Sequence, residues 1–186
     1  MRAVPAPIAV LIPYAPGGLR EEVLEQLLRV LPVEAHPMPW PLIDLEMEYG
    51  RLLAKLWVSC GAKHRDLMVV EQDIVVPGNV RETLRCREPW CGHSYQVAWG
   101  GLAEQYGGNL GLGCIRFRWP LMRAEPDAWE IALARRMRKG KPPGHYAHLD
   151  GALNDVLFGR GYSPHRHQPD ATHLHEYALA EAVSRG

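Results

Sequence analysis

Two carboxylates interrupt an apolar run near the middle of the chain, in the segment DLMVVEQDIVVP at residues 66–77. Glu71 and Asp73 stand between two apolar triplets. If the segment is one strand, both side chains lie on the same side of it, because strand side chains alternate. Carboxylate oxygens are the ligands that Mn²⁺ or Mg²⁺ prefers, and such a cation could hold a diphosphate. The alternative is a solvated pair, or pairing with Arg65 or Arg81.

A third carboxylate, Asp150, stands just before an apolar pattern at Leu153, Val156 and Leu157 that predicts a helix. A carboxylate at a helix N-terminus either caps the helix or serves as a reactive group at the mouth of a site. Residues 129–138 predict another short helix, whose basic face we expect to be solvated.

Cysteine and histidine are the remaining candidate metal ligands. Four cysteines are too few for a disulfide scaffold in a chain of this size. Cys86 and Cys91 are separated by four residues, which is wider than the usual two-residue zinc spacing and favours free thiols over a zinc site. Four of the nine histidines gather near the C-terminus: His165, His167, His173 and His175. They could form a separate zinc site or complete the cation site begun by Asp73.

Composition limits the possible class of protein. The 186 residues suit one domain. The chain carries 21 basic and 21 acidic side chains, so its net charge offers no footprint for nucleic acid or an anionic membrane. No apolar run approaches the roughly 18 residues of a membrane span, so we expect a soluble, cytoplasmic protein.

The elements that would position these residues alternate between strand and helix. Apolar patterns predict a strand, a helix, a weak strand, a helix and a third strand at 8–12, 19–31, 33–36, 45–60 and 66–77. Each parallel crossover needs a helix to return the chain, so we expect an α/β fold with a mainly parallel central sheet flanked by helices. Ligands of such sheets bind beyond the carboxyl ends of the strands, where Glu71 and Asp73 would lie.

Taken in order, these segments resemble a GT-A type glycosyltransferase, of the nucleotide-diphosphosugar-dependent class and family-2-like. The resemblance rests on IAVLIPY, on VVEQDIVVP in place of a DxD-type element, on LGLGCIRF in the sugar-pocket region, and on HLDGALNDVLFGRGY. It implies a single GT-A-like (Rossmann-like) domain over residues 1–186, with a His-rich C-terminal segment, 162–186, that completes the site.

The resemblance also implies roles for individual residues. Asp73 would bind Mn²⁺ or Mg²⁺ directly, with His173 or His175 as a ligand from the tail. Glu71 would bind the cation through water or contact the ribose. The other donor-binding residues would be Pro13, Tyr14, Arg51, Gly111, Gly113 and Arg116. A surface ion pair is the alternative for Arg51, and an ion pair at the edge of the core is the alternative for Arg116.

The implied activity is metal-dependent transfer of a sugar from a nucleotide-diphosphosugar to an acceptor hydroxyl, with inversion favoured. Asp150 would be the base that takes the hydroxyl proton as it attacks. The acceptor is left open as a glycan, a small molecule or a modified nucleic acid. Two alternatives remain: a structural metal-binding module, and a sugar transferase acting on modified DNA bases.

Overall fold

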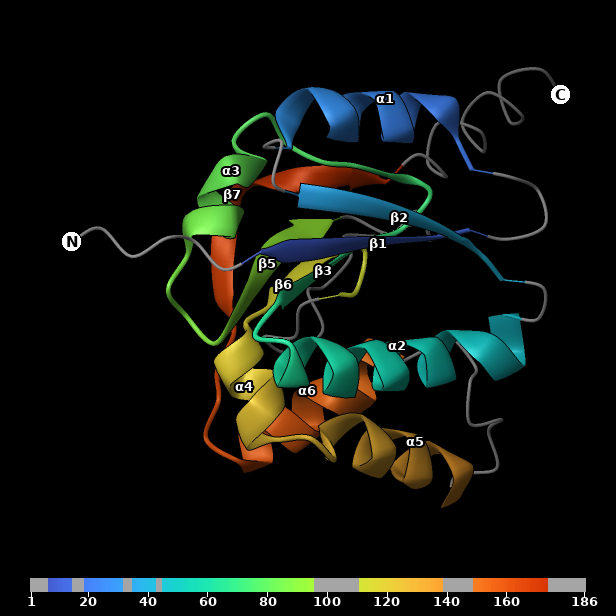
Figure 1. Cartoon of the computed structure of the whole chain (residues 1–186), viewed down its shortest axis with the longest axis vertical. Helices are drawn as coiled ribbons and strands as arrows, with labels where there is room; N and C mark the ends of the chain where they lie inside the picture. Colours follow the sequence, from blue (N-terminus) through green and yellow to red (C-terminus); the bar gives the residue numbers. More distant parts are fainter. Residues whose placement is uncertain are drawn as a thin grey trace, which may run out of the picture.

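The computed structural model describes residues 7–14, 19–31, 35–42, 45–95, 111–138 and 149–173. They contain a seven-stranded sheet with helices on both faces (Figure 1). The strands are β1 (Ile8–Tyr14), β2 (Ala35–Pro41), β3 (Asp66–Val70), β4 (Ile74–Val75), β5 (Trp90–Tyr95), β6 (Cys114–Phe117) and β7 (His165–His173). The helices are α1 (Glu21–Val30), α2 (Leu45–Ala62), α3 (Val80–Arg85), α4 (Trp119–Ala124), α5 (Ala128–Arg138) and α6 (Leu149–Gly159).

The strand order is β2-β1-β3-β6-β5-β7-β4. β1 runs parallel to both β2 and β3, and β5 runs parallel to β7. β6 is antiparallel to its neighbours β3 and β5, and β4 is antiparallel to β7. Five strands therefore share one direction while β6 and β4 oppose it. This arrangement confirms the predicted α/β class with a mainly parallel sheet.

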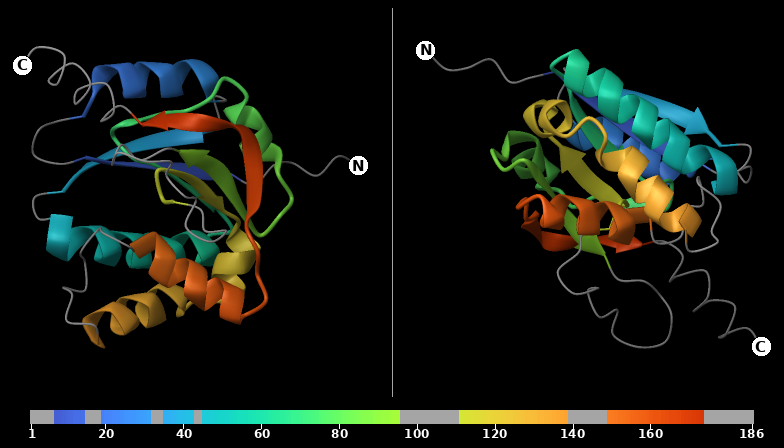
Figure 2. Two further views of the ribbon diagram at one scale, coloured as in Figure 1. Left: turned by 180° about the vertical axis from the view of Figure 1, so that it is seen from behind. Right: turned by 90° about the horizontal axis from the view of Figure 1, so that it is seen from below.

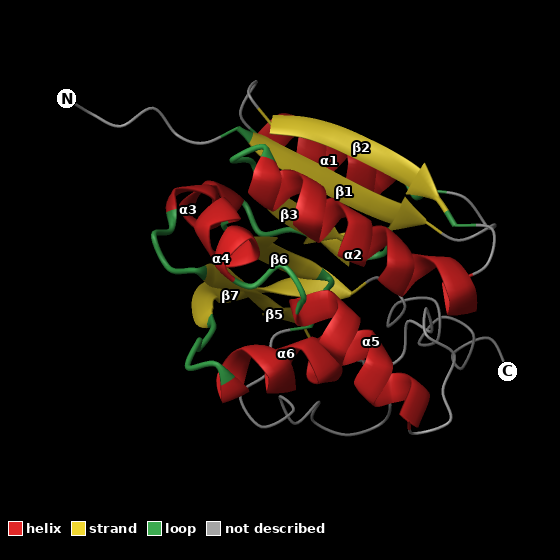
Figure 3. Cartoon of the chain, turned by 60° about the horizontal axis from the view of Figure 1, so that its bottom comes forward, coloured by secondary structure: helices red, strands yellow, loops and turns green. Residues whose placement is uncertain are grey.

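Strand alternation divides the core into two clusters. Val10 and Ile12 pack with α1 residues on one face, whereas Ala9 and Leu11 pack with α2 on the other. Helices α2, α4, α5 and α6 cover that second face (Figure 3). No helix in the described part of the chain is long and apolar enough to cross a membrane.

The second strand differs from its predicted position. We predicted residues 33–36, but β2 begins at Ala35 and runs through three alternate prolines at 37, 39 and 41. The predicted strand wrongly ended before these prolines. They are tolerated because β2 lies at the edge of the sheet and pairs with β1 alone. Alternate residues of a strand direct their backbone N–H groups to the same side. At these three prolines that side is the open edge of the sheet, so the absence of the N–H costs the ladder no hydrogen bond.

The acidic segment is also not one continuous strand. β3 ends at Val70, and residues 71–73 form a turn that the Ile74 N–H closes by donating to the Glu71 carbonyl at 3.1 Å. The chain then enters β4, where Ile74 pairs with His173 at the end of β7. The carboxylates therefore stand in a turn between two strands at the carboxyl end of β3.

Candidate functional site

Glu71 is held at the carboxyl end of β3 by contacts from two other segments. Its backbone N–H donates to the Gly113 carbonyl at 3.0 Å, beside the start of β6. The hydroxyl of Tyr49, a buried residue of α2, donates to Glu71 Oε1 at 2.9 Å. The sheet and the helix below it thus fix both the backbone and the side chain of this residue.

The electrostatic environment of Glu71 shows that further carboxylates converge on it. Burial raises the pKa of Glu71 to about 7, against the hydrogen bond from Tyr49, which lowers it. The negative charges of Asp73 and Asp150 raise this pKa further. Asp73 is itself only 8% exposed. Two carboxylates, one near in sequence and one distant, therefore act on Glu71 at the carboxyl end of β3.

Asp150 lies in the first turn of α6, as the sequence predicted. Its Oδ1 accepts the N–H of Gly151 at 2.7 Å, and Asn154 donates to its carbonyl at 2.7 Å. The side chain remains half-buried and within electrostatic range of Glu71. Asp150 thus combines a contact with its own helix end and a place beside the other carboxylates.

Arg136 was not identified from the sequence. We predicted a solvated basic face for α5, yet Arg136 is only 6% exposed, and its charge acts on Asp150. Its Nε and Nη2 atoms have no hydrogen-bond partner. The available signal was position, because Arg136 follows the buried Ala132 and Leu133 at helical spacing. Buried guanidinium donors without a protein partner are suited to binding an anion.

Arg116 occupies the place that the sequence analysis gave as its alternative role. It forms a buried ion pair with Asp66, and its Nη1 donates to the carbonyls of Thr83 at 2.7 Å and Cys86 at 2.9 Å. Asp66 begins β3, so the pair lies away from the end of that strand where Glu71 stands. We correct the donor-binding assignment of Arg116 because its guanidinium is engaged in the core.

Arg51 does not face the carboxylates either. It is exposed on α2, two residues after Tyr49 and therefore about 200° around the helix from it. Pro13 and Tyr14 do lie at the carboxyl end of β1, where the Tyr14 carbonyl accepts the Leu42 N–H at 2.9 Å. Their predicted contact with a nucleotide stays a prediction.

The predicted site also includes two glycines and two histidines. Gly111 and Gly113 precede β6, on the turn whose Gly113 carbonyl meets Glu71. The backbone of His173 pairs with Ile74, one residue from Asp73. His175 lies outside the described residues. The chain thus brings the predicted glycines and one predicted tail histidine to the acidic turn.

Carboxylate and imidazole groups are a donor set that fits Mn²⁺ or Mg²⁺ by ligand type. Among the described residues, the carboxylates do not form a tight group of three or more ligand atoms. The residues that could hold such a cation are Asp73 and Glu71, and the backbone of His173 pairs with the neighbouring Ile74.

The chain resembles known proteins in its fold and not in its sequence. No family model matches the sequence, and no curated protein matches it. A proposed nucleotide-diphospho-sugar transferase from Desulfovibrio desulfuricans G20 matches with a TM-score of 0.55 and 11% identity over 90% of this chain and 82% of its own. The apo-form glycosyltransferase GlyE of Streptococcus pneumoniae TIGR4 matches with a TM-score of 0.50 and 10% identity.

The second match covers 84% of this chain, which spans 44% of the length of GlyE. At these identities the likeness concerns the fold, and the family-2-like assignment stays a prediction. The chain has a GT-A-like fold, similar to those of a proposed nucleotide-diphospho-sugar transferase and a glycosyltransferase.

Proposed function

We propose that this chain is a nucleotide-sugar-dependent glycosyltransferase whose donor site lies at the acidic turn. The observation that carries the proposal is the position of Glu71 at the carboxyl end of β3, where burial raises its pKa and the charges of Asp73 and Asp150 raise it further. Strongly perturbed carboxyl groups at the carboxyl edge of an α/β sheet are typical of functional sites. The likeness of the fold to a proposed nucleotide-diphospho-sugar transferase and to a glycosyltransferase supports the same conclusion.

The acidic turn has the chemistry to hold a divalent cation. Asp73 and Glu71, with His173 or His175, would hold Mn²⁺ or Mg²⁺, which when bound would offset the negative charge of a leaving nucleoside diphosphate. Without a bound cation, the negative charges of Glu71 and Asp73 repel each other, and partial burial of the turn strengthens this repulsion. Tyr49 keeps the Glu71 carboxylate in one orientation through its hydrogen bond.

Asp150 and Arg136 would act on the acceptor and the donor. Asp150 is half-buried and close enough to Glu71 to affect its pKa, and it would take the proton of an attacking hydroxyl. The unpartnered Nε and Nη2 atoms of Arg136 would donate to diphosphate oxygens. Direct attack by the activated hydroxyl would invert the anomeric carbon, and we keep inversion as part of the proposal.

The acceptor would be a glycan, a small molecule or a modified nucleic acid. The zero net charge of the chain favours the first two, because proteins that bind nucleic acid usually carry a basic surface. A cytoplasmic location likewise stays a prediction. The alternative of a structural metal-binding module concerns a different set of residues, the cysteine and histidine cluster of Cys86, Cys91 and His167.

The experiment that tests the proposal is a thermal-shift screen against UDP, GDP, CDP, ADP and dTDP, each with Mn²⁺, Mg²⁺ or EDTA. We expect one diphosphate to raise the melting temperature only with a divalent cation, because a ligand stabilises the state that binds it. Asp73→Asn should lose this shift, whereas Glu130→Gln, at an exposed position of α5, should retain it. If no diphosphate changes the melting temperature with either cation, the proposal is wrong.

A further inference from the structure

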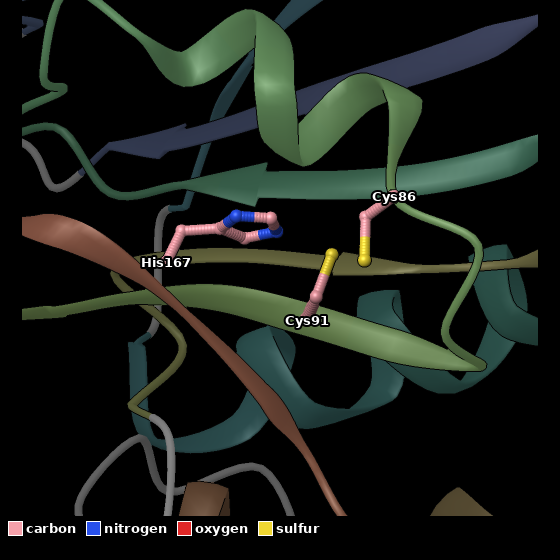
Figure 4. A group of neighbouring side chains, drawn as sticks. All are labelled: Cys86, Cys91 and His167. Atoms are coloured by element: carbon pink, nitrogen blue, oxygen red, sulfur yellow. The ribbon is translucent and has the colours of Figure 1, made fainter.

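A second cluster of metal-ligand side chains lies below the short helix α3. Cys86 directly follows α3, Cys91 lies on β5, and His167 lies on β7. The two sulfur atoms and one ring nitrogen of His167 all lie within 4.8 Å of one another. Figure 4 shows the imidazole ring of His167 extending toward both sulfur atoms. Three segments thus bring three soft or borderline ligands to one point.

Sheet register explains how the cluster forms. β5 and β7 lie side by side (Figure 2), with Cys91 paired to His165 and His93 paired to His167. Trp90 packs in the core on the α2 face, so Cys91 faces the opposite side, toward α3. The cluster therefore lies on the other face of the sheet from Tyr49, the partner of Glu71. It is distinct from the acidic turn.

The cluster contains a buried polar atom that lacks a hydrogen-bond partner. His167 is 9% exposed, and its Nε2 atom has no hydrogen-bond partner. The neighbouring His93 is engaged, since its Nε2 lies 2.8 Å from the Thr83 hydroxyl. A buried imidazole nitrogen without a partner is unfavourable, and a bound metal ion would satisfy it.

A fourth ligand is available at the mouth of the cluster. Nδ1 of His165 lies 3.3 Å from the sulfur of Cys86. His165 is exposed and Cys86 is half-buried, so an ion can enter from this side. Zinc bond lengths place tetrahedral ligand atoms roughly 3.3–3.8 Å apart, so the atoms of the three clustered residues, all within 4.8 Å of one another, need to close by about 1.5 Å at most.

We propose that Cys86, Cys91 and His167 bind a structural zinc ion, with His165 as the fourth ligand. Two thiolates with imidazole nitrogens are the donor set of structural zinc sites. The ion would join the end of α3 to β5 and β7, three segments that are otherwise connected through the sheet and a few side chains. Four protein ligands would leave no open position, so the ion would be structural and separate from the exchangeable cation of the acidic turn.

Burial favours metal binding at His167 and opposes it at Cys91, so the proposal rests on the geometry of the cluster. Burial, with the charges of the neighbouring His165 and His93, lowers the pKa of His167 and favours the neutral ring that a metal binds. Burial raises the pKa of Cys91, so its thiol stays protonated until an ion displaces the proton. Metal binding should accordingly release protons.

The test uses the full chain, purified with a reductant, stripped with a chelator and titrated with Co²⁺. We expect a thiolate-to-cobalt absorption band and the intense visible bands of tetrahedral cobalt, both removed by Zn²⁺. Cys86→Ala should weaken Co²⁺ binding by more than about a hundredfold, since even the loss of an outer-shell partner costs up to that much. Cys60→Ala, the same change at a buried cysteine on α2, should leave binding unchanged.

The remaining variants separate the two metal sites and test the fourth ligand. His165→Ala should weaken binding by at least about tenfold and reduce the tetrahedral bands. Asp73→Asn should leave the cobalt spectrum intact, so that failure of one proposal is distinguishable from failure of the other. Cobalt without a thiolate band, an unchanged affinity in Cys86→Ala, or no metal binding by the reduced chain would each overturn the zinc site.

Discussion

Replacing Glu71 with Gln should stabilise the chain at alkaline pH. The folded-state pKa of Glu71 is raised from 4.5 to about 7, chiefly by burial, with contributions from Asp73 and Asp150. Between these two pH values the folded chain binds more protons than the unfolded chain, so stability falls as pH rises through this window. The glutamine is isosteric and uncharged, and its amide oxygen still accepts the Tyr49 hydroxyl.

The size of the effect follows from the pKa difference. The rise from 4.5 to about 7 corresponds to about 3 kcal/mol, at about 1.4 kcal/mol for each pKa unit. Glu71 retains some contact with solvent, which reduces the cost of burying its charge and screens its repulsion from the other carboxylates. We therefore expect Glu71→Gln to unfold with a free energy about 2 kcal/mol higher than the natural chain at pH 8, and with little difference at pH 4.5.

Urea denaturation between pH 4.5 and 8 measures this difference. The two curves should diverge as pH rises and run parallel above about pH 7. Glu130→Gln, an exposed residue in the first turn of α5, is the matched control and should follow the natural chain. A Glu71→Gln variant whose stability difference does not change with pH, or is negative at pH 8, would refute the reasoning.

Three further substitutions test the surroundings of the site. Tyr49→Phe should cost about 1 kcal/mol of unfolding free energy at pH 8, and less in acid, because the lost hydrogen bond is made to the Glu71 carboxylate. Asp66→Asn should cost about 3 kcal/mol in urea denaturation, because Arg116 then stays buried without its countercharge. Asp150→Asn should retain donor binding in calorimetry and lose sugar transfer in a turnover assay.

An exposed ion pair provides the control for Asp66→Asn. Arg29 and Glu25 are joined at 3.0 Å on the exposed face of α1, and Glu25→Gln should cost at most about 0.5 kcal/mol. Equal losses from the two acid-to-amide changes would show that burial does not govern the core pair. An unaltered transfer rate in Asp150→Asn would place the base elsewhere.

The first half of the fold could be predicted because its signals are local. Apolar runs and helical spacing predicted β1, α1 and α2 close to their observed positions and the start of β3, although the predicted strand at 66–77 is divided by a turn. β2 was misplaced because the tolerance of an edge strand for proline depends on which strand pairs beside it. The residue type alone does not carry that information.

The remaining positions depend on contacts distant in the sequence. Cys86 lies 79 residues from its neighbour His165, and the pairing of β5 with β7 that brings them together has no local signal. The same holds for Arg116, whose ion pair with Asp66 joins residues 50 apart. The spacing of Cys86 and Cys91 alone favours free thiols over a zinc site. The fold changes this by bringing His167 and His165 beside the two cysteines.

The most direct test of the proposed donor site is calorimetric titration of nucleoside diphosphates, with and without Mn²⁺. We predict that the natural chain and Glu130→Gln bind one diphosphate only with Mn²⁺, and that Asp73→Asn binds it at least about tenfold more weakly. Equal diphosphate affinity in Asp73→Asn and the natural chain, or binding that does not depend on Mn²⁺, would contradict a donor site at the acidic turn.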